Sequence, residues 1–118
     1  LLCDPGQATL KPQAAPLLEH VARLLNARGL TNPIRVEGNT DSIPISTPQF
    51  HSNWELSTAR ATAVLSFLLA HGVQPSRLSV AGYADQRPIA SNTTAAGRSL
   101  NRRVDLVVLR EQTGSVKP

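Results

Sequence analysis

The chain switches between helix-like and strand-like spacing of its apolar residues, and this alternation limits the folds open to it. Residues 13–27 repeat apolar side chains at steps of three and four residues, the spacing of an amphipathic helix. These side chains are Leu17, Leu18, Val21, Leu24 and Leu25. Pro16 is tolerated in an early turn of such a helix, and Gly29 can end it. Residues 34–40 instead alternate apolar and charged side chains, as a half-exposed strand does.

The later segments continue the alternation. Ser52 and Glu55 have the spacing of a capping box, which predicts that a second helix begins there and runs to about Ala70. A third extended segment, a short helix capped by Thr93 or Thr94 and a buried apolar strand are then expected. They cover residues 78–82, 93–102 and 104–109.

The order of elements predicts one two-layer α/β domain. With residues 1–4 read as a truncated first strand, helices and strands alternate along the chain. We therefore expect helices packed on one sheet of about four strands. A length of 118 residues with 41% apolar content suits a single core, which we assign to residues 1–110. Residues 111–118 have little to bury and are expected to form a disordered tail.

Composition narrows the possible functions. Twelve Lys and Arg against eight Asp and Glu give a net charge of +4, which suits nucleic acid, lipid headgroups or an acidic polymer. Only 3% of residues are aromatic, so the stacked platforms that bind single-stranded bases are not expected, and nucleic-acid binding is not favoured. The single cysteine, Cys3, excludes an internal disulfide and a Cys-rich zinc pattern, and no cofactor is predicted.

The sequence carries no pattern typical of a membrane span or an enzyme. Its longest nearly apolar run, residues 63–70, is far shorter than the ~18 residues that cross a bilayer, so any membrane anchor is expected outside this sequence. His20, His51, His71 and Cys3 show no known nucleophile–base or metal-ligand spacing. We therefore predict a protein that is not an enzyme, with His51 as the one histidine near the candidate site.

Arg60 is the most informative polar residue. Steps of ~100° around the second helix place it at the centre of an apolar stripe. The side chains expected to pack on the sheet from this helix are Trp54, Leu56, Val64 and Phe67. A guanidinium on that face must find an anion or carbonyl groups, because an unpaired buried charge costs several kcal/mol.

Two interpretations of Arg60 remain open on spacing alone. It can form a structural ion pair or extend past the helix end, or it can bind a ligand together with Asp41. In the second case the pair would suit a zwitterion, with a carboxylate on Arg60 and an ammonium on Asp41. Asp41 can equally be a turn residue, and Asn53 a helix-start residue. Arg102, like its basic neighbours, can simply complement the C-terminus of the short helix.

Four linked blocks of sequence resemble the signature of OmpA-like domains in order and spacing. They span nearly the whole chain, from about residue 2 to residue 109. The blocks are residues 36–41, residues 53–61, residues 82–90 and residues 92–104. The family resemblance implies a mixed sheet and binding of peptidoglycan through the zwitterionic end of diaminopimelate in the stem peptide.

The resemblance also implies which residues bind that ligand. The aspartate and arginine of the family match Asp41 and Arg60, the pair that the helix geometry already suggested. The other implied site residues are Asn53, Arg102, Thr40 and Leu56. Asn39 departs from the family, which usually has His or Tyr there, and this puts one contact with the ligand in question but not the charged pair.

The insertion over residues 43–50 resembles two subgroups of the family. It is similar to the MotB subgroup, which implies a homodimer in the periplasm of a Gram-negative bacterium, joined to the stator partner MotA through a transmembrane segment outside this sequence. It also resembles OmpA-like domains of type VI secretion anchors. A membrane helix carrying an aspartate would favour the stator, and a larger cytoplasmic domain would favour secretion.

Overall fold

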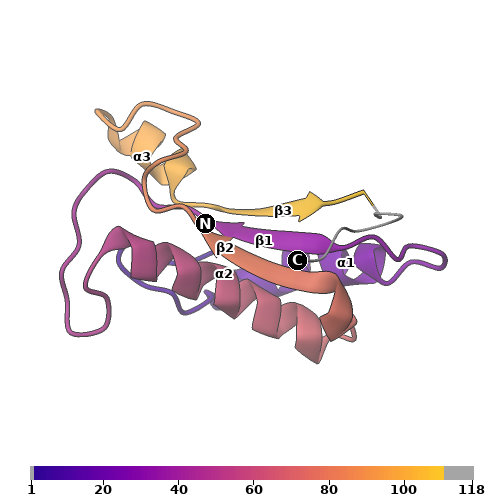
Figure 1. Ribbon diagram of the computed structural model, residues 1–118. Coiled ribbons are helices and arrows are strands. Elements are labelled where there is room, and N and C mark those ends of the chain that lie inside the picture. The colour runs from indigo at the N-terminus through magenta and orange to yellow at the C-terminus, as the bar shows by residue number, and fades with distance from the viewer. Residues whose placement is uncertain (1, 111–118) are drawn as a thin grey trace, which may run out of the picture.

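A computed structural model describes residues 2–110 of the chain. Its elements, in chain order, are η1 (Pro12–Ala14), α1 (Ala15–Leu25), β1 (Ile34–Gly38), α2 (Asn53–Ala70), η2 (Pro75–Arg77), β2 (Leu78–Gly82), α3 (Ala95–Asn101) and β3 (Val104–Val108). Helices α1 and α2 pack on one face of the sheet, and α3 lies beyond one end of it (Figure 1). The expected two-layer α/β sandwich is confirmed. Residue 1 and the tail expected over residues 111–118 lie outside the described residues.

The sheet is mixed, with strand order β2-β1-β3. Strand β1 pairs in parallel with β2 and antiparallel with β3. Within the described residues the sheet has three strands, because residues 2–4 do not form the first strand expected there. The carbonyl of Leu2 instead accepts a hydrogen bond from the amide of Lys11, at 2.7 Å, so this segment folds back on the loop before α1.

The core lies between the central strand and the two long helices. Ile34 and Val36 of β1 are fully buried against side chains from α1 and α2. Strand β3 was expected to be buried, and this was wrong: its residues are half-buried, and Val108 is 51% exposed. It lies at the sheet edge, where only Val104 and Leu106 pack against the core. An apolar run alone does not distinguish a central strand from an edge strand.

The buried face of α2 differs from the expected face by a small rotation. It consists of Leu56, Ser57, Arg60, Ala61, Val64 and Leu68. Leu56 and Val64 are buried as predicted, and Phe67, although only half-buried, packs against the core and stacks on the ring of His71. Trp54 was predicted to pack inward, and this was wrong, because it is 54% exposed. Helix α2 begins directly after Ser52, as predicted, but neither bond of the expected capping box forms. The Ser52 side chain makes no capping bond, and Glu55 accepts from the amide of His51 and not from that of Ser52.

Two glycines explain this rotation. A Cβ on Gly38 would lie 1.8 Å from the carbonyl oxygen of Ser57, and one on Gly82 would lie 2.1 Å from Oγ1 of Thr58. The ends of β1 and β2 therefore touch the helix backbone directly, and small residues of α2 face them. This close approach places the first turns of α2, including Arg60, beside the loop that follows β1.

We expect Gly38→Ala to destabilise the protein by about 1–3 kcal/mol, because the added methyl group must push the helix backbone away from β1. Gly82→Ala should cost less, since its nearest backbone neighbour, the amide nitrogen of Thr58, lies 2.8 Å from the added Cβ, whereas the Ser57 carbonyl oxygen lies 1.8 Å from that of Gly38→Ala. Denaturant unfolding of both variants tests this ranking. An unchanged midpoint for Gly38→Ala would contradict the close approach.

A polar cluster lies on the sheet face opposite α1 and α2. Glu37 alternates with the buried Ile34 and Val36 and is itself only 7% exposed. Its Oε2 accepts from Nε of Arg35 at 2.6 Å and from the hydroxyl of Tyr83 at 3.0 Å. Burial alone would raise the pKa of Glu37, but these two hydrogen bonds and the charge of Arg35 outweigh it and lower the pKa below 4.5.

A lowered pKa in the folded state makes Glu37 stabilise the fold at higher pH. This stabilisation is fully present above the unfolded-state pKa and is lost as pH falls through the lower folded-state pKa. The difference in unfolding free energy between the parent and Glu37→Gln should therefore shrink as the solution is acidified from neutral pH. Glu19→Gln, at an exposed position on α1, is the matched control. Parallel stability profiles for parent and Glu37→Gln would contradict this assignment.

Candidate functional site

A hollow of about 290 Å³ opens between the loop after β1 and the first turns of α2. All six residues expected at the site line it, namely Thr40, Asp41, Asn53, Leu56, Arg60 and Arg102. They come from three separate parts of the chain: the end of β1, helix α2 and the residue that follows α3. The structure thus brings the candidate residues together around one cavity.

Arg60 is a buried cation held by carbonyl groups. It is 2% exposed, and its guanidinium donates to the backbone oxygens of Gln7 at 2.8 Å, Asp4 at 3.1 Å and Asn39 at 3.5 Å. Within residues 2–110 it forms no ion pair, so the structural ion pair considered from the sequence is wrong. Burial and the neighbouring charge of Arg102 lower the pKa of Arg60, and the nearby Cys3 and Asp41 offset this only in part. A buried cation without a counter-ion favours an anionic ligand.

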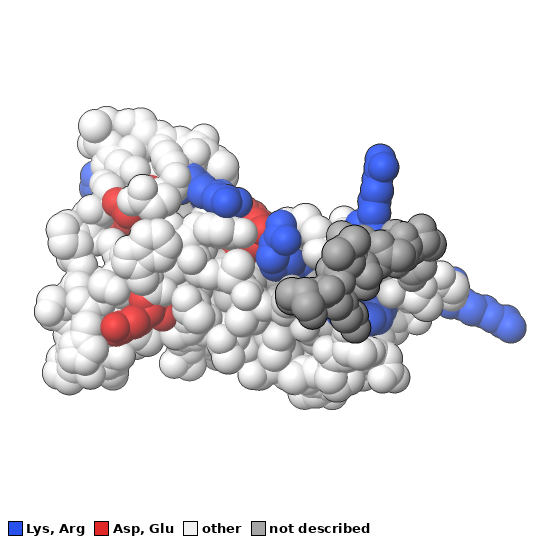
Figure 2. Space-filling view, in the orientation of Figure 1, with Lys and Arg blue, Asp and Glu red and all other residues white. Residues whose placement is uncertain are grey.

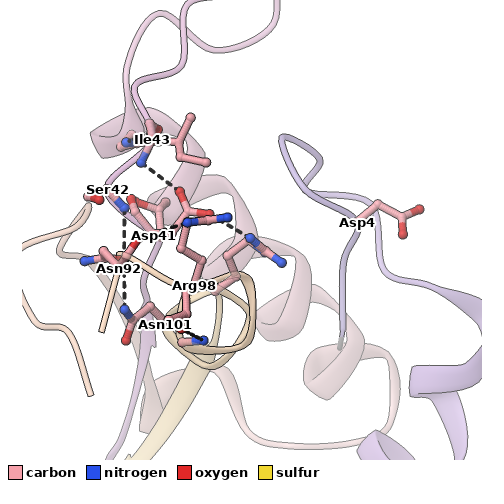
Figure 3. A network of polar contacts seen from close by, with 12 residues as sticks. Asp4, Asp41, Ser42, Ile43, Asn92, Arg98 and Asn101 are labelled. Carbon is pink, nitrogen blue, oxygen red and sulfur yellow. Dashed lines mark hydrogen bonds and ion pairs between the residues drawn. The ribbon is translucent and has the colours of Figure 1, made fainter. Parts of the chain in front are cut away.

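Asp41 is paired with Arg102, not with Arg60. Its Oδ2 accepts from Nη1 of Arg102 at 2.7 Å, and its Oδ1 accepts from the amide of Ile43 at 3.0 Å (Figure 3). The second bond is the local turn contact that the sequence also allowed. Asp41 is 7% exposed, so both oxygens are used in a largely buried position.

The charges around the cavity favour a ligand with a carboxylate. The lining includes one carboxylate, Asp41, and two guanidiniums, Arg60 and Arg102, which leaves a formal charge of +1. Within the described residues, the buried Nε of Arg102 has no hydrogen-bond partner and is a further donor. The site therefore offers excess donors to an anion and one carboxylate to a cation.

Asn101 holds the loops around the site in place. It is fully buried, and its Oδ1 accepts from the amides of Ile89 and Ala90 at 2.8 and 3.0 Å. Its Nδ2 donates to Oδ1 of Asn92 at 2.9 Å, and that oxygen also accepts from the amide of Ser42 at 3.3 Å. Figure 3 shows this chain of contacts running from α3 to the Asp41 loop. The network links Arg102, which follows α3, to the position of Asp41.

Five further residues line this cavity that were not predicted from the sequence. They are Pro5, Gly6, Ile43, Pro44 and Ile45. The last three belong to the insertion, whose prolines were a signal of a fixed loop, whereas the first two showed no pattern that would link them to the site. Asn53 stabilises the insertion by donating from Nδ2 to the carbonyl of Ile43 at 3.0 Å.

The other candidate groups lie elsewhere. His51 is exposed and does not line this cavity, and Nδ1 of His71 contacts the carbonyl of Phe67 at 2.9 Å. Among residues 2–110 no three His, Cys, Asp or Glu side chains are grouped so that they could hold a metal ion. No helix in that range is both long and apolar enough to cross a membrane. The cap of α3 was expected at Thr93 or Thr94. It is Thr94, whose hydroxyl accepts from the amide of Gly97.

Comparison with known proteins agrees with this fold. Motility protein B of Bacillus subtilis is 38% identical over 110 residues, which are 90% of this chain and 41% of that protein. A putative MotB-like protein of Desulfovibrio vulgaris superposes with a TM-score of 0.84 at 34% identity, over 93% of this chain and 70% of the other. The cell wall anchor of the type VI secretion system of Pseudomonas aeruginosa gives 0.83 at 36% identity, over 93% and 76%.

Two facts set the scope of this similarity. The chain spans about half the length of the curated relatives that it matches. The OmpA family model matches residues 3–102, which include every residue predicted for the site. The chain therefore belongs to the OmpA family.

Proposed function

We propose that this domain binds peptidoglycan without cleaving it, by holding the zwitterionic end of diaminopimelate in the Asp41 cavity. The observation that carries the proposal is Arg60, a buried guanidinium that lines the cavity and is held only by neutral carbonyls. A ligand carboxylate there would supply the missing negative charge. Ion pairs of this kind are strongest where water is excluded.

In this proposal the three charged residues that line the cavity, Asp41, Arg60 and Arg102, all contact the ligand. A ligand ammonium would bind Asp41, whose Oδ2 is now held by Arg102. Arg102 has further donors and can contact the ligand carboxylate beside Arg60 while it stays close to Asp41. Leu56 and Ile43 line the same cavity and would pack against the ligand's methylene chain.

We further propose that the domain anchors a membrane complex to the cell wall from the periplasm. The similarity to MotB proteins supports a flagellar stator, in which the chain would form a homodimer and engage MotA through another part of the protein. The similar TM-score of the secretion-system anchor supports the second candidate, a type VI secretion anchor. The sequence that precedes this domain in the full protein distinguishes the two.

The surface supports this proposal over nucleic-acid binding. On the face seen in Figure 2, basic side chains lie in several separate places, and acidic side chains lie beside some of them. A nucleic-acid backbone would require a continuous basic stripe. In the cavity, two guanidiniums, Arg60 and Arg102, accompany one carboxylate, Asp41. The positive charge proposed to act on the ligand is therefore in the cavity.

We expect Asp41→Asn to reduce binding to purified peptidoglycan sacculi by at least about 30-fold. A ligand ammonium without its partner costs roughly 2–5 kcal/mol, whereas the amide keeps the shape of the side chain. Arg60→Ala is a less clean test, because it also removes the guanidinium that donates to three backbone carbonyls. Sedimentation with sacculi and a thermal melt are measured together.

Asp4→Asn is the matched control for that experiment. Its carboxylate is on the surface, and only its backbone carbonyl contacts Arg60. This variant should bind as the parent does. A folded Asp41→Asn variant that still binds like the parent would remove Asp41 from the site.

Arg102→Lys tests the role of the third charge. Lysine can still neutralise Asp41, so the melting temperature should change little. It lacks the planar guanidinium, whose several N–H donors can contact Asp41 and the ligand at the same time. We expect sacculus binding to fall about tenfold, which corresponds to ~1.4 kcal/mol. Arg28→Lys, at an exposed position, should change neither quantity. Parent-like binding by Arg102→Lys would limit Arg102 to pairing with Asp41.

A further inference from the structure

A second hollow adjoins the Asp41 cavity. Its volume is about 280 Å³, and it shares Pro44, Ile45 and Asn53 with the first, so the insertion after β1 forms the wall between them. The first hollow holds the charged residues, whereas the second holds an indole, Trp54, and one carboxylate, Asp85. The two hollows thus offer different chemistry to neighbouring parts of one ligand.

Trp54 is presented to solvent by the first turn of α2. Its side chain is 54% exposed although it is the largest in the chain. Its backbone carbonyl accepts from the hydroxyls of Ser57 and Thr58, at 3.0 and 2.9 Å, which fixes the residue on the helix. Among the described contacts, its indole N–H donates to no protein group. An exposed aromatic ring with an unused donor is typical of a binding surface.

The remaining lining supplies polar groups around the indole. Ser42 and Ser52 contribute hydroxyls, and Asp85 contributes a carboxylate with Oδ1 bonded to the neighbouring Gln86. Ring stacking together with hydroxyl and carboxylate groups suits a sugar. A pyranose has an apolar face of C–H groups and a rim of hydroxyl and amide groups that need hydrogen-bond partners.

The backbone beside Asp85 is held in a strained conformation. Ala84 has φ of 52°, the only positive φ of a non-glycine residue among those described. It is buried; its amide donates to Oγ of Ser57 at 3.1 Å, and its carbonyl accepts from the amide of Thr40 at 2.8 Å. Strain of this kind persists where the surrounding structure imposes it, and it is concentrated at functional sites. Here it directs the chain so that Asp85 reaches the second hollow.

We propose that this second hollow is a subsite for an amino sugar of the glycan strand, with the sugar ring stacked on Trp54 and its polar rim facing Asp85, Ser42 and Ser52. The proposal rests on the proposed function, because the sugar would belong to the same molecule as the bound stem peptide. Two residues separate diaminopimelate from the sugar, and the diaminopimelate side chain adds to this because its zwitterionic end is the bound group, so the reach exceeds the roughly 7 Å of two extended residues. Two hollows with a common wall suit a ligand of that length.

The test compares three ligands by calorimetry: a disaccharide–tripeptide containing diaminopimelate, the same tripeptide without sugar, and the disaccharide alone. We expect the disaccharide–tripeptide to bind the parent about tenfold more tightly than the tripeptide. Trp54→Ala should bind the tripeptide as the parent does and lose that advantage. Leu17→Ala removes another exposed apolar side chain, distant from Trp54 in the sequence. This control variant should keep the tighter binding of the disaccharide–tripeptide.

Tryptophan fluorescence gives a second readout, because Trp54 is the only tryptophan in the chain. The emission of the parent should shift when the disaccharide–tripeptide binds and should not shift with the tripeptide. This measurement remains informative even where Trp54→Ala does not fold.

The outcomes separate the two proposals. A parent protein that binds neither the tripeptide nor the disaccharide–tripeptide overturns the proposed function itself. If the tripeptide binds but the sugar adds no affinity and no spectral shift, the subsite alone is overturned. An emission shift that follows protein concentration without ligand would assign Trp54 to contact between copies and would also overturn the subsite.

Discussion

The burial of Arg60 is the constraint on which the rest of the site depends. A guanidinium that is 2% exposed must have its donors satisfied, and it reaches carbonyls of Asp4, Gln7 and Asn39. These three carbonyls belong to the N-terminal segment and to the end of β1. One side chain therefore ties two distant stretches of the chain to α2 and forms the floor of the cavity between them.

Close packing of α2 on the sheet makes that arrangement possible. Gly38 leaves room for the helix backbone, and the loop after β1 therefore starts beside the first turns of α2. Asp41 then lies within 2.7 Å of Arg102, which is 61 residues further along the chain. The buried Asn101 fixes the loops around this pair by its hydrogen bonds. The positions of Asp41 and Arg102 thus depend on packing and hydrogen bonds made by other residues, Gly38 and Asn101.

The insertion after β1 separates two environments. On one side it closes the charged cavity, and on the other it borders the hollow beside Trp54. Asn53 holds the insertion by donating to the carbonyl of Ile43, so a residue that the sequence suggested as a ligand contact or a helix start also positions the wall. The proposed ligand, a peptide that carries a sugar, would meet ion pairing on one side of this wall and stacking on the other.

Much of this was predictable from periodicity and short motifs: the order of elements after the N-terminal segment, a cap at Thr93 or Thr94, and Arg60 on a buried face. Periodicity reports which side chains share one face of a helix or strand, because that depends only on the local backbone. It does not report which distant neighbour each one meets. The pairing of Asp41 with Arg102, the edge position of β3 and the exposure of Trp54 depend on contacts between segments far apart in sequence, and only the packed tertiary structure decides them.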